Sequence, residues 1–518
     1  MPNGLGTILW ADDEIDLLKP HIIFLKGKGY NVLTVNNGRD ALDMVANTHV
    51  DLIILDENMP GLTGLETLSR IKQTLPHTPV IMITKSEEEN IMDQAVGSKI
   101  ADYLIKPVNP NQILLSIKKN LHGDQLVSEQ ATNDYRQEFN RISAAIGECR
   151  SFDDWKELYS RLVYWELELA ATETNMAELL DMQKREADTA FAKFVRLNYE
   201  TWITSDDPAT HPLMSHELFR KKVFPLIDAG EKLFFIVIDN FRLDQWRTIK
   251  PILSEYFTFD EDCYCSILPT ATQYARNAIF SGLMPIDIER MFPELWVDED
   301  EPEGKNLNES PLIATQFDRF RRKCRFSYNK INDSAAGDKL IREFANLEHN
   351  QLNVVVINFI DMLSHARTES KMIRELASSD AAYRSITESW FRHSSALELF
   401  RKIAEKGYKI VLTTDHGTIC VDNPVKVVGD KNTNTNLRYK VGKNLNYNSK
   451  QVYEIKRPQQ YGLPSPNVSS TYIFAYGRDF FAYPNNYNHY VQYYTGTFQH
   501  GGISLEEMVV PLITLTAK

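Results

Sequence analysis

Three apolar runs in the second half of the chain each lead into an aspartate, which can bind a metal ion or take part in acid–base catalysis. The runs cover residues 233–238, 354–360 and 410–414, and they close on Asp239, Asp361 and Asp415. His365 lies four residues after Asp361, and His416 directly follows Asp415. Apolar runs rich in β-branched residues are typical of buried parallel strands, whose carboxyl ends gather ligands at one edge of a sheet. Three carboxylates at one edge would repel one another at pH 7, so the pattern favours a metal centre.

A threonine-rich segment could supply a hydroxyl to such a centre. Pro269-Thr270-Ala271-Thr272 follows a strand-like run at 263–268 and precedes a helical pattern. A hydroxyl at a helix N-terminus faces free backbone N–H groups, which favour phosphate. Arg276 and Asn277, one turn on, are further candidates for phosphate contacts, although capping or surface roles explain them equally well. His500 stands far downstream in a glycine-flanked turn, Gln499-His500-Gly501-Gly502.

A second set of chemically capable residues lies near the N-terminus. Strand candidates cover residues 7–11, 31–35, 52–55, 80–84 and 103–105, with helical segments between them, which predicts a doubly wound α/β unit. The strand ends carry Asp12 and Asp13, Asp56, Thr84, and Lys106 in turn. Carboxylates of this kind can hold Mg²⁺. A lysine can neutralise an added phosphoryl group, and a threonine can donate a hydrogen bond to it.

The stretch from about residue 124 to 204 is almost free of glycine and reads as helical. Its apolar residues recur at alternating steps of three and four, which places them on one helix face: Trp155, Leu158, Leu162, Trp165 and Leu169. Ser151 or Asp153 could cap that helix. We expect a helical bundle or antiparallel hairpin. The apolar face could pack within one chain or join two chains.

Composition bounds the remaining possibilities. A chain of 518 residues is too long for one core. No apolar stretch approaches the ~20 residues that span a bilayer, and no secretory signal is recognisable, so we expect a cytoplasmic protein without membrane insertion. The 5 cysteines argue against a disulfide framework. The net charge of −13 disfavours charge-driven binding to duplex DNA.

Two segments resemble insertions. Residues 296–310 are acidic and rich in turn formers, and residues 421–450 are rich in Asn and Lys with little periodicity. The second follows Asp415-His416, so we weigh a lid or substrate-contacting role against a solvated loop. Residues 456–500 are dense in tyrosine and asparagine, which fits either a substrate surface or strands packed on a core.

The first 122 residues or so resemble the receiver domain of bacterial two-component response regulators, through the elements DDE, LDENMPG, MIT and ADYLIKP. The resemblance implies a flavodoxin-like five-stranded parallel sheet with Asp56 as phosphoacceptor. It also implies Mg²⁺ held at Asp56 by Asp12, Asp13 and the backbone carbonyl of Asn58. Thr84 and Tyr103 would be the switch pair, and Lys106 would precede a cis Lys–Pro bond.

Residues 206–518 resemble the alkaline phosphatase superfamily, most closely its PglZ-type branch, through dispersed motifs in the order Asp, Thr, Asp-x-x-x-His, Asp-His, His. The resemblance implies an alkaline-phosphatase-like α/β sandwich with two Zn²⁺ ions. Asp361, His365 and His500 would bind one ion, and Asp239, Asp415 and His416 would bind the other. Thr272 would bridge toward the second ion as nucleophile, because phosphodiesterase-like members use the second threonine of a Pro-Thr-x-Thr stretch.

Rival reactions of the superfamily fit less well. A sulfatase would need a modifiable residue in Cys-x-Pro-x-Arg, a pattern that Cys265-Ser266-Ile267-Leu268 lacks. A cofactor-independent phosphoglycerate mutase would use serine and manganese. Thr272 favours hydrolysis of phosphate diesters or monoesters. Because no second arginine-rich cluster suggests a monoester pocket, we favour diesters such as linear or cyclic oligonucleotides.

The order of the parts, receiver at 1–122, helical bundle at 123–205 and PglZ-like domain at 206–518, resembles response regulators of type IX secretion. That resemblance implies a sensor histidine kinase, an extracytoplasmic-function sigma factor and a secretion-motor component as partners, and a homodimer formed on phosphorylation of Asp56. The alternative is a non-catalytic signalling adaptor whose metal is structural. Thr272 favours the enzyme, because a structural metal site needs no nucleophile.

Overall fold

The protein is described by a computed structural model covering residues 5–85, 97, 100–170, 176–205, 207, 211–298, 301, 305–377, 379–429, 433–465, 467 and 469–518. It forms two compact units, Met1–Asn133 and Asp134–Lys518. Within the described residues, no helix is long and apolar enough to cross a membrane.

The first unit is built on a parallel sheet with the strand order β2-β1-β3-β4-β5. Its strands are β1 (Thr7–Ala11), β2 (Asn31–Val35), β3 (Leu52–Asp56), β4 (Val80–Thr84) and β5 (Asp102–Ile105). Its helical segments are η1 (Ile15–Leu18), α1 (Lys19–Gly27), α2 (Gly38–Asn47) and α3 (Gly64–Thr74). Neighbouring residues such as Ile53 and Ile54 are buried in separate clusters on opposite faces of the sheet. The predicted doubly wound fold and its five strands are confirmed.

Helix α5 (Pro110–Glu148) contributes to both units. Ile113 and Ile117 belong to the core of the first unit, whereas Tyr135, Ile142 and Ile146 belong to the core of the second. The boundary expected at residue 122 lies inside this continuous helix, so no break in the backbone marks it.

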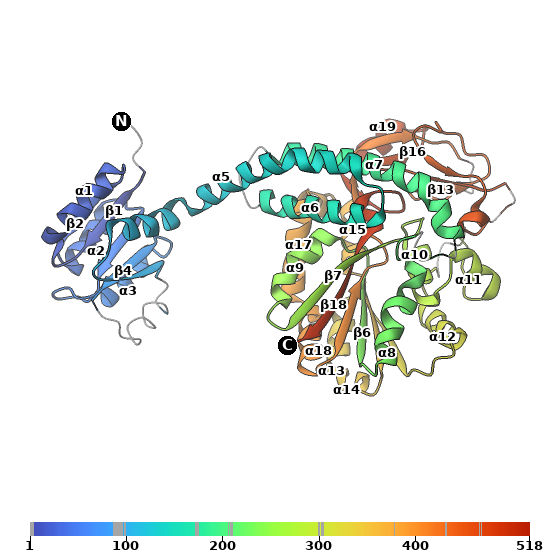
Figure 1. The fold of residues 1–518 in the computed structure, drawn as a ribbon, viewed down its shortest axis with the longest axis horizontal. Coiled ribbons are helices and arrows are strands. Elements are labelled where there is room, and N and C mark those ends of the chain that lie inside the picture. Colours follow the sequence, from blue (N-terminus) through green and yellow to red (C-terminus); the bar gives the residue numbers. More distant parts are fainter. Residues whose placement is uncertain are drawn as a thin grey trace. The chain divides into compact units, whose positions relative to one another are not determined.

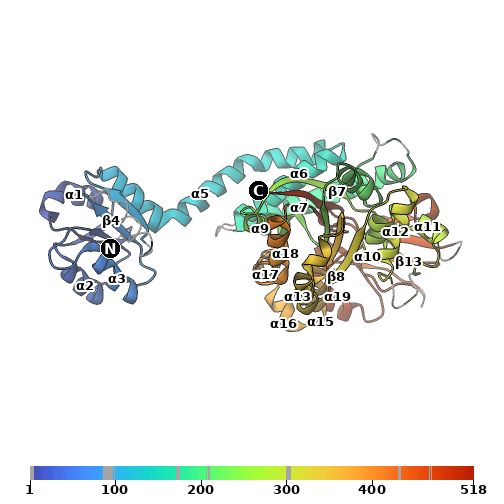
Figure 2. The ribbon, with the colours of Figure 1, turned by 90° about the horizontal axis from the view of Figure 1, so that it is seen from below.

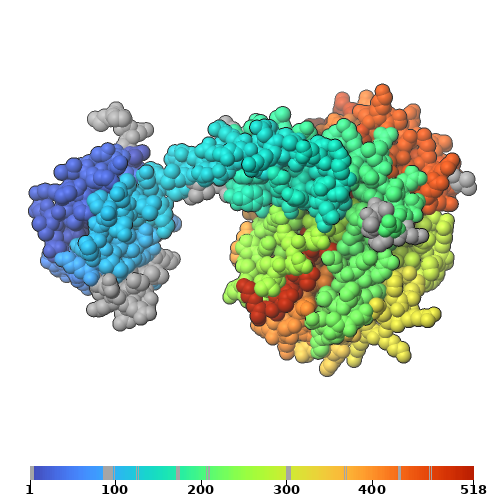
Figure 3. Space-filling view, in the orientation of Figure 1, coloured from blue at the N-terminus to red at the C-terminus, as the bar shows by residue number. Residues whose placement is uncertain are grey.

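Two further helices, α6 (Phe152–Ala170) and α7 (Met176–Thr204), lie side by side in the second unit (Figure 1). The predicted apolar face is confirmed, since its five residues from Trp155 to Leu169 are all buried. The Ser151 hydroxyl accepts the Asp154 N–H at 3.2 Å and so begins α6. Figure 3 shows that these helices cover part of the α/β body rather than standing free.

The α/β body is built on a six-stranded sheet with the order β7-β18-β10-β6-β9-β8. Its strands are β6 (Leu233–Ile238), β7 (Phe257–Cys265), β8 (Phe326–Ile331), β9 (Leu352–Ile357), β10 (Lys409–Thr413) and β18 (Val509–Ala517). Strands β10, β6, β9 and β8 are parallel, and β18 runs antiparallel to β10. Strand β7 pairs antiparallel with β18 and so runs in the same direction as the four parallel strands. The three apolar runs therefore supply neighbouring strands, as the sequence predicts.

The second run differs from the prediction at its end. Strand β9 stops at Ile357, and the chain enters α15 (Phe359–Glu369) after Asn358. Asp361 therefore lies in the first turn of a helix and not at the end of a strand. The apolar pair Phe359-Ile360 continues the run in sequence but belongs to the helix, and periodicity cannot separate a buried strand from a buried first turn.

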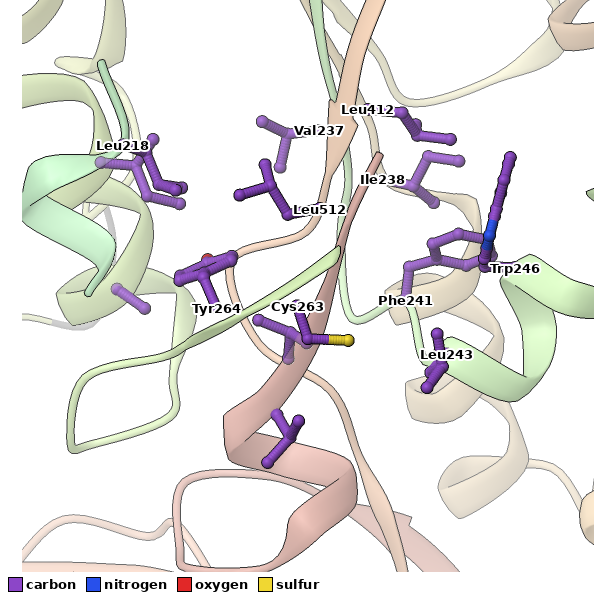
Figure 4. Close-up of a cluster of buried hydrophobic side chains, with 14 of the residues drawn as sticks. Leu218, Val237, Ile238, Phe241, Leu243, Trp246, Cys263, Tyr264, Leu412 and Leu512 are labelled. Carbon is purple, nitrogen blue, oxygen red and sulfur yellow. The ribbon is translucent and has the colours of Figure 1, made fainter. Parts of the chain in front are cut away.

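Helices cover both faces of this sheet (Figures 1 and 2). One layer contains α9 (Leu243–Leu253), α13 (Ser334–Arg342), α14 (Phe344–Leu347), α17 (Asp380–His393) and α18 (Ser395–Glu405). The other contains η2 (Ser215–Glu217), η3 (Phe219–Val223), α8 (Phe224–Asp228), α10 (Thr272–Ser281), α11 (Pro285–Met291) and α12 (Glu309–Arg319). In Figure 4, Val237 and Leu512 point toward Leu218, whereas Ile238 and Leu412 point toward Trp246, so alternate strand residues fill the two layers of the core.

Shorter elements complete the unit around the carboxyl edge of the sheet. They are α16 (Lys371–Leu376), β11 (Ile419–Val421), β12 (Asn423–Lys426), β13 (Tyr439–Gly442), β14 (Tyr453–Ile455), η4 (Pro458–Tyr461), β15 (Thr471–Phe474), β16 (Asp479–Ala482), α19 (Tyr487–Tyr494), β17 (Thr497–Gln499) and α20 (Leu505–Met508).

These elements correct the expectation of a long loop at 421–450. Strand β12 pairs with β16 and β13 pairs with β15, and Val425 and Val441 are buried. Strands of four residues are too short to show a period in sequence, which explains the error. The expected insertion at 296–310 is described only at 296–298, 301 and 305–310, where its last residues begin α12.

Candidate metal centre and phosphorylation site

Asp239 and Asp415 come together because their strands are neighbours. Asp239 directly follows β6, and its N–H donates to the Ile357 carbonyl of β9 at 2.9 Å. Asp415 follows β10 after one residue, and its backbone carbonyl accepts from the Ser266 hydroxyl at 2.6 Å. Both carboxylates are buried, Asp239 with 3% of its surface exposed and Asp415 with none.

A buried guanidinium lies against these two carboxylates. Arg276 Nη2 lies 3.0 Å from Asp415 Oδ2 and also contacts Asp239 Oδ2, while Nη1 donates to Glu309 Oε1 at 3.2 Å. Burial raises the pKa of Asp239 to about 6, against the opposing effect of Arg276. Asp239 Oδ1 is buried and accepts no hydrogen bond among the described residues, so one oxygen at this point remains available to a cation.

His416 presents one ring nitrogen to the same place. Its Nδ1 lies 3.2 Å from the Gly417 carbonyl and its Nε2 lies 3.1 Å from the Thr272 hydroxyl. Burial, followed by the neighbouring His500, holds the pKa of His416 well below its usual range, so the ring is neutral. Because Nδ1 must carry the proton to donate to a carbonyl, Nε2 has the lone pair that a metal or the Thr272 hydroxyl can use.

The remaining three candidates form a second group. His500 Nε2 lies 3.8 Å from Asp361 Oδ1, and His365 Nε2 lies 3.5 Å from Asp361 Oδ2. His500 Nδ1 lies 3.1 Å from the Thr270 carbonyl, and a hydrogen bond there orients the ring so that Nε2 faces Asp361, as carbonyl groups orient metal-binding histidines. The His416 and His500 rings stack with centroids 4.2 Å apart, so the two groups adjoin each other.

Each group has the composition and closeness of a metal site. Asp361, His365 and His500 form site A, and Asp239, Asp415 and His416 form site B; the ligand atoms of each lie within 4.8 Å of one another. Mixed carboxylate and imidazole ligation suits zinc. The unpartnered Asp239 oxygen and the two carbonyl-oriented rings fit this ion. When bound, zinc would lower the pKa of a coordinated hydroxyl and offset the carboxylate charge.

Thr272 is the first residue of α10 and lies at the edge of site B. Ala271 is the N-cap residue, in extended conformation, and it has no side chain that could cap the helix. The first backbone N–H groups of α10 therefore face the same region as the Thr272 hydroxyl, which suits an anionic phosphate. The structure brings together Thr272 and all six candidate zinc ligands; their functional roles stay predictions.

The two candidate phosphate contacts, Arg276 and Asn277, are both buried and both bind other parts of the protein. Arg276 is 1% exposed and is held by three carboxylates, so it could reach a phosphate only by giving up one of them. Asn277 is buried and donates to the Lys305 carbonyl at 3.2 Å. Both side chains thus have structural partners, and phosphate contact remains untested.

Two residues that support the site, Asn240 and Glu309, were not predicted from the sequence. Asn240 has φ of 64° and donates to Asp361 Oδ1 at 3.4 Å and to Ser364 Oγ at 3.2 Å, so it connects the turn after Asp239 with site A. Asparagine tolerates this left-handed conformation better than most residues. An asparagine directly after the aspartate at the end of a strand could therefore have indicated this turn. Glu309 accepts a hydrogen bond from Arg276 but lies in another helix, α12, so the sequence gives no indication of this contact.

In the first unit the acidic residues also converge. Asp12, Asp13 and Asp56 have carboxylate oxygens within 4.8 Å of one another, and Lys106 Nζ lies 2.9 Å from Asp12 and 2.8 Å from Asp56. Burial raises the pKa of Asp56, partly opposed by Lys106. Although burial lowers the pKa of Lys106, its hydrogen bonds to the two acids outweigh this and raise it. Oxygen-rich clusters of this kind suit Mg²⁺.

The expected switch pair and its surroundings are also in place. Thr84 is fully buried, and its side chain forms a hydrogen bond with Tyr103, which is partly buried. The Lys106–Pro107 peptide bond is cis. Asn58 is exposed directly after Glu57, and the role of its carbonyl in magnesium binding stays a prediction.

Comparison with known families agrees with both units. The model of the response regulator receiver domain matches residues 8–118, that of the PorX response regulator linker domain matches 125–203, and that of the BREX system PglZ alkaline phosphatase-like domain matches 218–515. The fold and the sites therefore define a response regulator whose output domain is alkaline phosphatase-like. Because the last match covers more than half of the chain, the protein belongs to the PglZ alkaline phosphatase-like family, with the receiver and linker of a PorX-like architecture.

Curated relatives share only part of the chain. The uncharacterized transcriptional regulatory protein YkoG of Bacillus subtilis is 32% identical over 30% of this chain and 68% of its own length. The transcriptional regulatory protein CpxR of Escherichia coli is 33% identical over 25% of this chain and 55% of its own length. A CheY-like receiver domain from Methanospirillum hungatei is 27% identical, covering 22% of this chain and 92% of its own, with a TM-score of 0.22.

Proposed function

We propose that the protein is a response regulator whose output is zinc-dependent hydrolysis of phosphate diesters, with linear or cyclic oligonucleotides as the substrate class. The observation that carries the proposal is the placement of the Thr272 hydroxyl 3.1 Å from His416 Nε2, at the edge of two adjoining carboxylate–imidazole groups. A metal site with a purely structural role needs no hydroxyl at its edge.

The residues of the chain account for both halves of such a reaction. The Thr272 hydroxyl loses its proton to solvent and its oxygen attacks phosphorus in line. A new P–O bond forms as the bond from phosphorus to the ester oxygen opposite breaks, and that oxygen leaves with a proton taken from solvent. Water then displaces the threonine oxygen from phosphorus and restores the hydroxyl. The N-terminus of α10 faces the phosphoryl oxygens throughout and favours their negative charge.

The decisive variants are Thr272→Ser and Thr272→Ala. With zinc supplied, we expect Thr272→Ala to hydrolyse bis(4-nitrophenyl) phosphate at least about 10³ times more slowly than the wild-type protein, and Thr272→Ser to retain part of the activity. Zinc content should be similar in all three proteins, because two groups of three other ligands remain. Equal rates in Thr272→Ala and the wild type would favour the adaptor, in which this domain binds partners without catalysis.

A comparison of two model substrates tests the proposed substrate class. The sequence shows no second arginine-rich cluster that could hold the dianion of a phosphate monoester. We therefore expect faster turnover of diester than of monoester model substrates. The zinc-loaded protein should therefore cleave bis(4-nitrophenyl) phosphate faster than 4-nitrophenyl phosphate. Much faster monoester cleavage would contradict the choice of diesters.

Control of this output is proposed to run through Asp56. The convergence of Asp12, Asp13, Asp56 and Lys106 supports a magnesium-dependent aspartyl phosphate supplied by a sensor histidine kinase. From the resemblance to type IX secretion regulators, we propose homodimer formation on phosphorylation, and an extracytoplasmic-function sigma factor and a secretion-motor component as partners. Equal molecular mass with and without beryllofluoride, measured by light scattering, would exclude phosphorylation-driven pairing.

A further inference from the structure

A cavity of about 450 Å³ opens at the carboxyl edge of the α/β sheet, next to site A but separate from it. It is lined by the ends of β8 and β9, the start of α15, the end of α17 and the starts of α13 and α18. Helices α13, α17 and α18 lie together on this side of the sheet (Figure 2). Ligands of α/β proteins bind at this edge, and the volume is within the range of small-molecule sites.

Residues that line the cavity are connected through the backbone to one residue of site A and one residue of site B. Ile357, which lines it, accepts the backbone N–H of Asp239, a site B residue, at 2.9 Å. Phe359 also lines it and lies in the same first turn of α15 as Asp361, a site A residue. The cavity therefore lies at the same edge of the sheet as Asp239 and Asp361.

The chemistry of the lining favours a flat, uncharged ring. Phe359 and Trp390 stack on each other with ring centroids 4.4 Å apart and an angle of 3° between their planes, which places a stacked aromatic pair in the wall of the cavity. None of the described lining residues is lysine or arginine, so the cavity is poorly suited to hold phosphate or carboxylate.

Polar groups nevertheless reach the cavity and could recognise the edge of a ring. The Asn332 side-chain oxygen accepts from Asn358 at 2.6 Å, which leaves its amide nitrogen to donate to a ligand. Ser389 and His393 add a hydroxyl and a ring nitrogen. Asp333 and Ser394 are engaged as the N-caps of α13 and α18. An aromatic wall with amide, hydroxyl and imidazole groups matches a nucleobase, with its apolar faces and polar edges.

We propose that this cavity is a nucleobase subsite, in which a base of the diester substrate stacks on the Phe359–Trp390 wall while the scissile phosphate lies at Thr272. The subsite rests on the proposed function for its role in catalysis. It gives the protein a means of preferring nucleotide diesters over diesters without a base.

Nucleoside binding tests the subsite without any reaction. We expect adenosine to bind the full-length, metal-free protein, measured by saturation-transfer NMR and calorimetry, and Trp390→Leu to weaken that binding by about tenfold or more. Tyr490→Leu, which removes an exposed aromatic ring from α19, is the control and should leave adenosine affinity unchanged. Absence of adenosine binding, or equal binding by Trp390→Leu and the wild type, would overturn the subsite.

Kinetics test its role in the zinc-loaded protein. For the diadenosine dinucleotide ApA, we expect Trp390→Leu to raise KM at least about fivefold with kcat retained, while KM for methyl 4-nitrophenyl phosphate is unchanged. Equal losses on both substrates would show a structural defect and contradict the subsite. Because adenosine binding requires neither metal nor turnover, a protein that binds adenosine through Trp390 but hydrolyses no diester would refute the proposed function alone.

Discussion

The phenolic oxygen of Tyr199, in helix α7, accepts a hydrogen bond of 2.8 Å from the backbone N–H of Leu268, four residues before Thr272. Both residues are fully buried. The helical hairpin therefore contacts the segment that carries the proposed nucleophile, and any shift of α7 relative to the α/β body would alter that segment.

The first prediction concerns this contact. Tyr199→Phe leaves the Leu268 N–H buried without a partner, which costs about 1–3 kcal/mol of stability. Because the lost bond holds the chain before Thr272, we also expect a reduced kcat for diester hydrolysis. Unfolding in urea and steady-state kinetics provide the two readouts.

A matched substitution provides the control for Tyr199→Phe. Tyr461 donates to Glu200 of the same helix at 3.0 Å, but this hydrogen bond is exposed to solvent. Tyr461→Phe should change stability by less than about 1 kcal/mol and leave kcat unchanged. If both variants lowered kcat equally, the contact between Tyr199 and Leu268 would have no particular role.

The second prediction concerns the buried Arg276. Replacing it with methionine leaves Asp239, Asp415 and Glu309 without their shared cation, which should cost about 3–5 kcal/mol in chelator-treated protein. A bound zinc ion would offset part of the carboxylate charge, so the loss should be smaller with zinc present. Denaturant titrations of both proteins, with and without zinc, measure this difference. An equal loss in both conditions would argue against a cation site at Asp239 and Asp415.

The third prediction concerns pH. Burial lowers the pKa of His216 to about 4, against an ordinary value near 6.5. Between these values the unfolded chain binds the proton that the folded chain excludes, so His216 stabilises the fold fully above pH 6.5 and loses this contribution as pH falls. The loss amounts to about 2 kcal/mol between pH 7.5 and pH 5. Urea unfolding at the two pH values should show a drop smaller by that amount in His216→Gln, and identical drops would contradict it.

The fourth prediction concerns the receiver. Asp56 is buried beside Asp12 and Lys106, and we expect acetyl phosphate with Mg²⁺ to add one phosphoryl group to the wild-type protein and none to Asp56→Asn. Intact-protein mass spectrometry measures the addition. Asp51→Asn, on an acid of the same unit whose side chain binds the Thr7 N–H, should be phosphorylated normally. Phosphorylation of Asp56→Asn would place the phosphoacceptor elsewhere.

How far the sequence predicts this protein depends on how local the determining signal is. Most of the receiver strands can be predicted because they are short apolar runs bounded by polar residues, as at residues 52–55. The stripe from Trp155 to Leu169 followed from helical periodicity. The end of β9 was missed because Phe359 and Ile360 extend the apolar run into a helix.

The parts of the centre that local patterns could not reveal depend on tertiary contacts. Arg276 reads as a surface or phosphate-binding residue until Asp239 and Asp415 are seen to surround it. The cavity beside Trp390 is lined by residues of six elements, so no single segment of the sequence predicts it. Asp239, Asp361 and Asp415 can be identified from the apolar runs that precede them, and His365 and His416 from their spacing to two of these aspartates. The division of the ligands into two zinc sites, and the inclusion of His500, rest on the family resemblance.

The most direct measurement of the account is anomalous diffraction at the zinc edge from crystals of the zinc-loaded protein. We predict two peaks in the α/β body, one among Asp361, His365 and His500 and one among Asp239, Asp415 and His416, with the Thr272 oxygen beside the second. Absence of both peaks, or zinc bound only away from Thr272, would contradict the proposal that this response regulator is a metal-dependent phosphodiesterase.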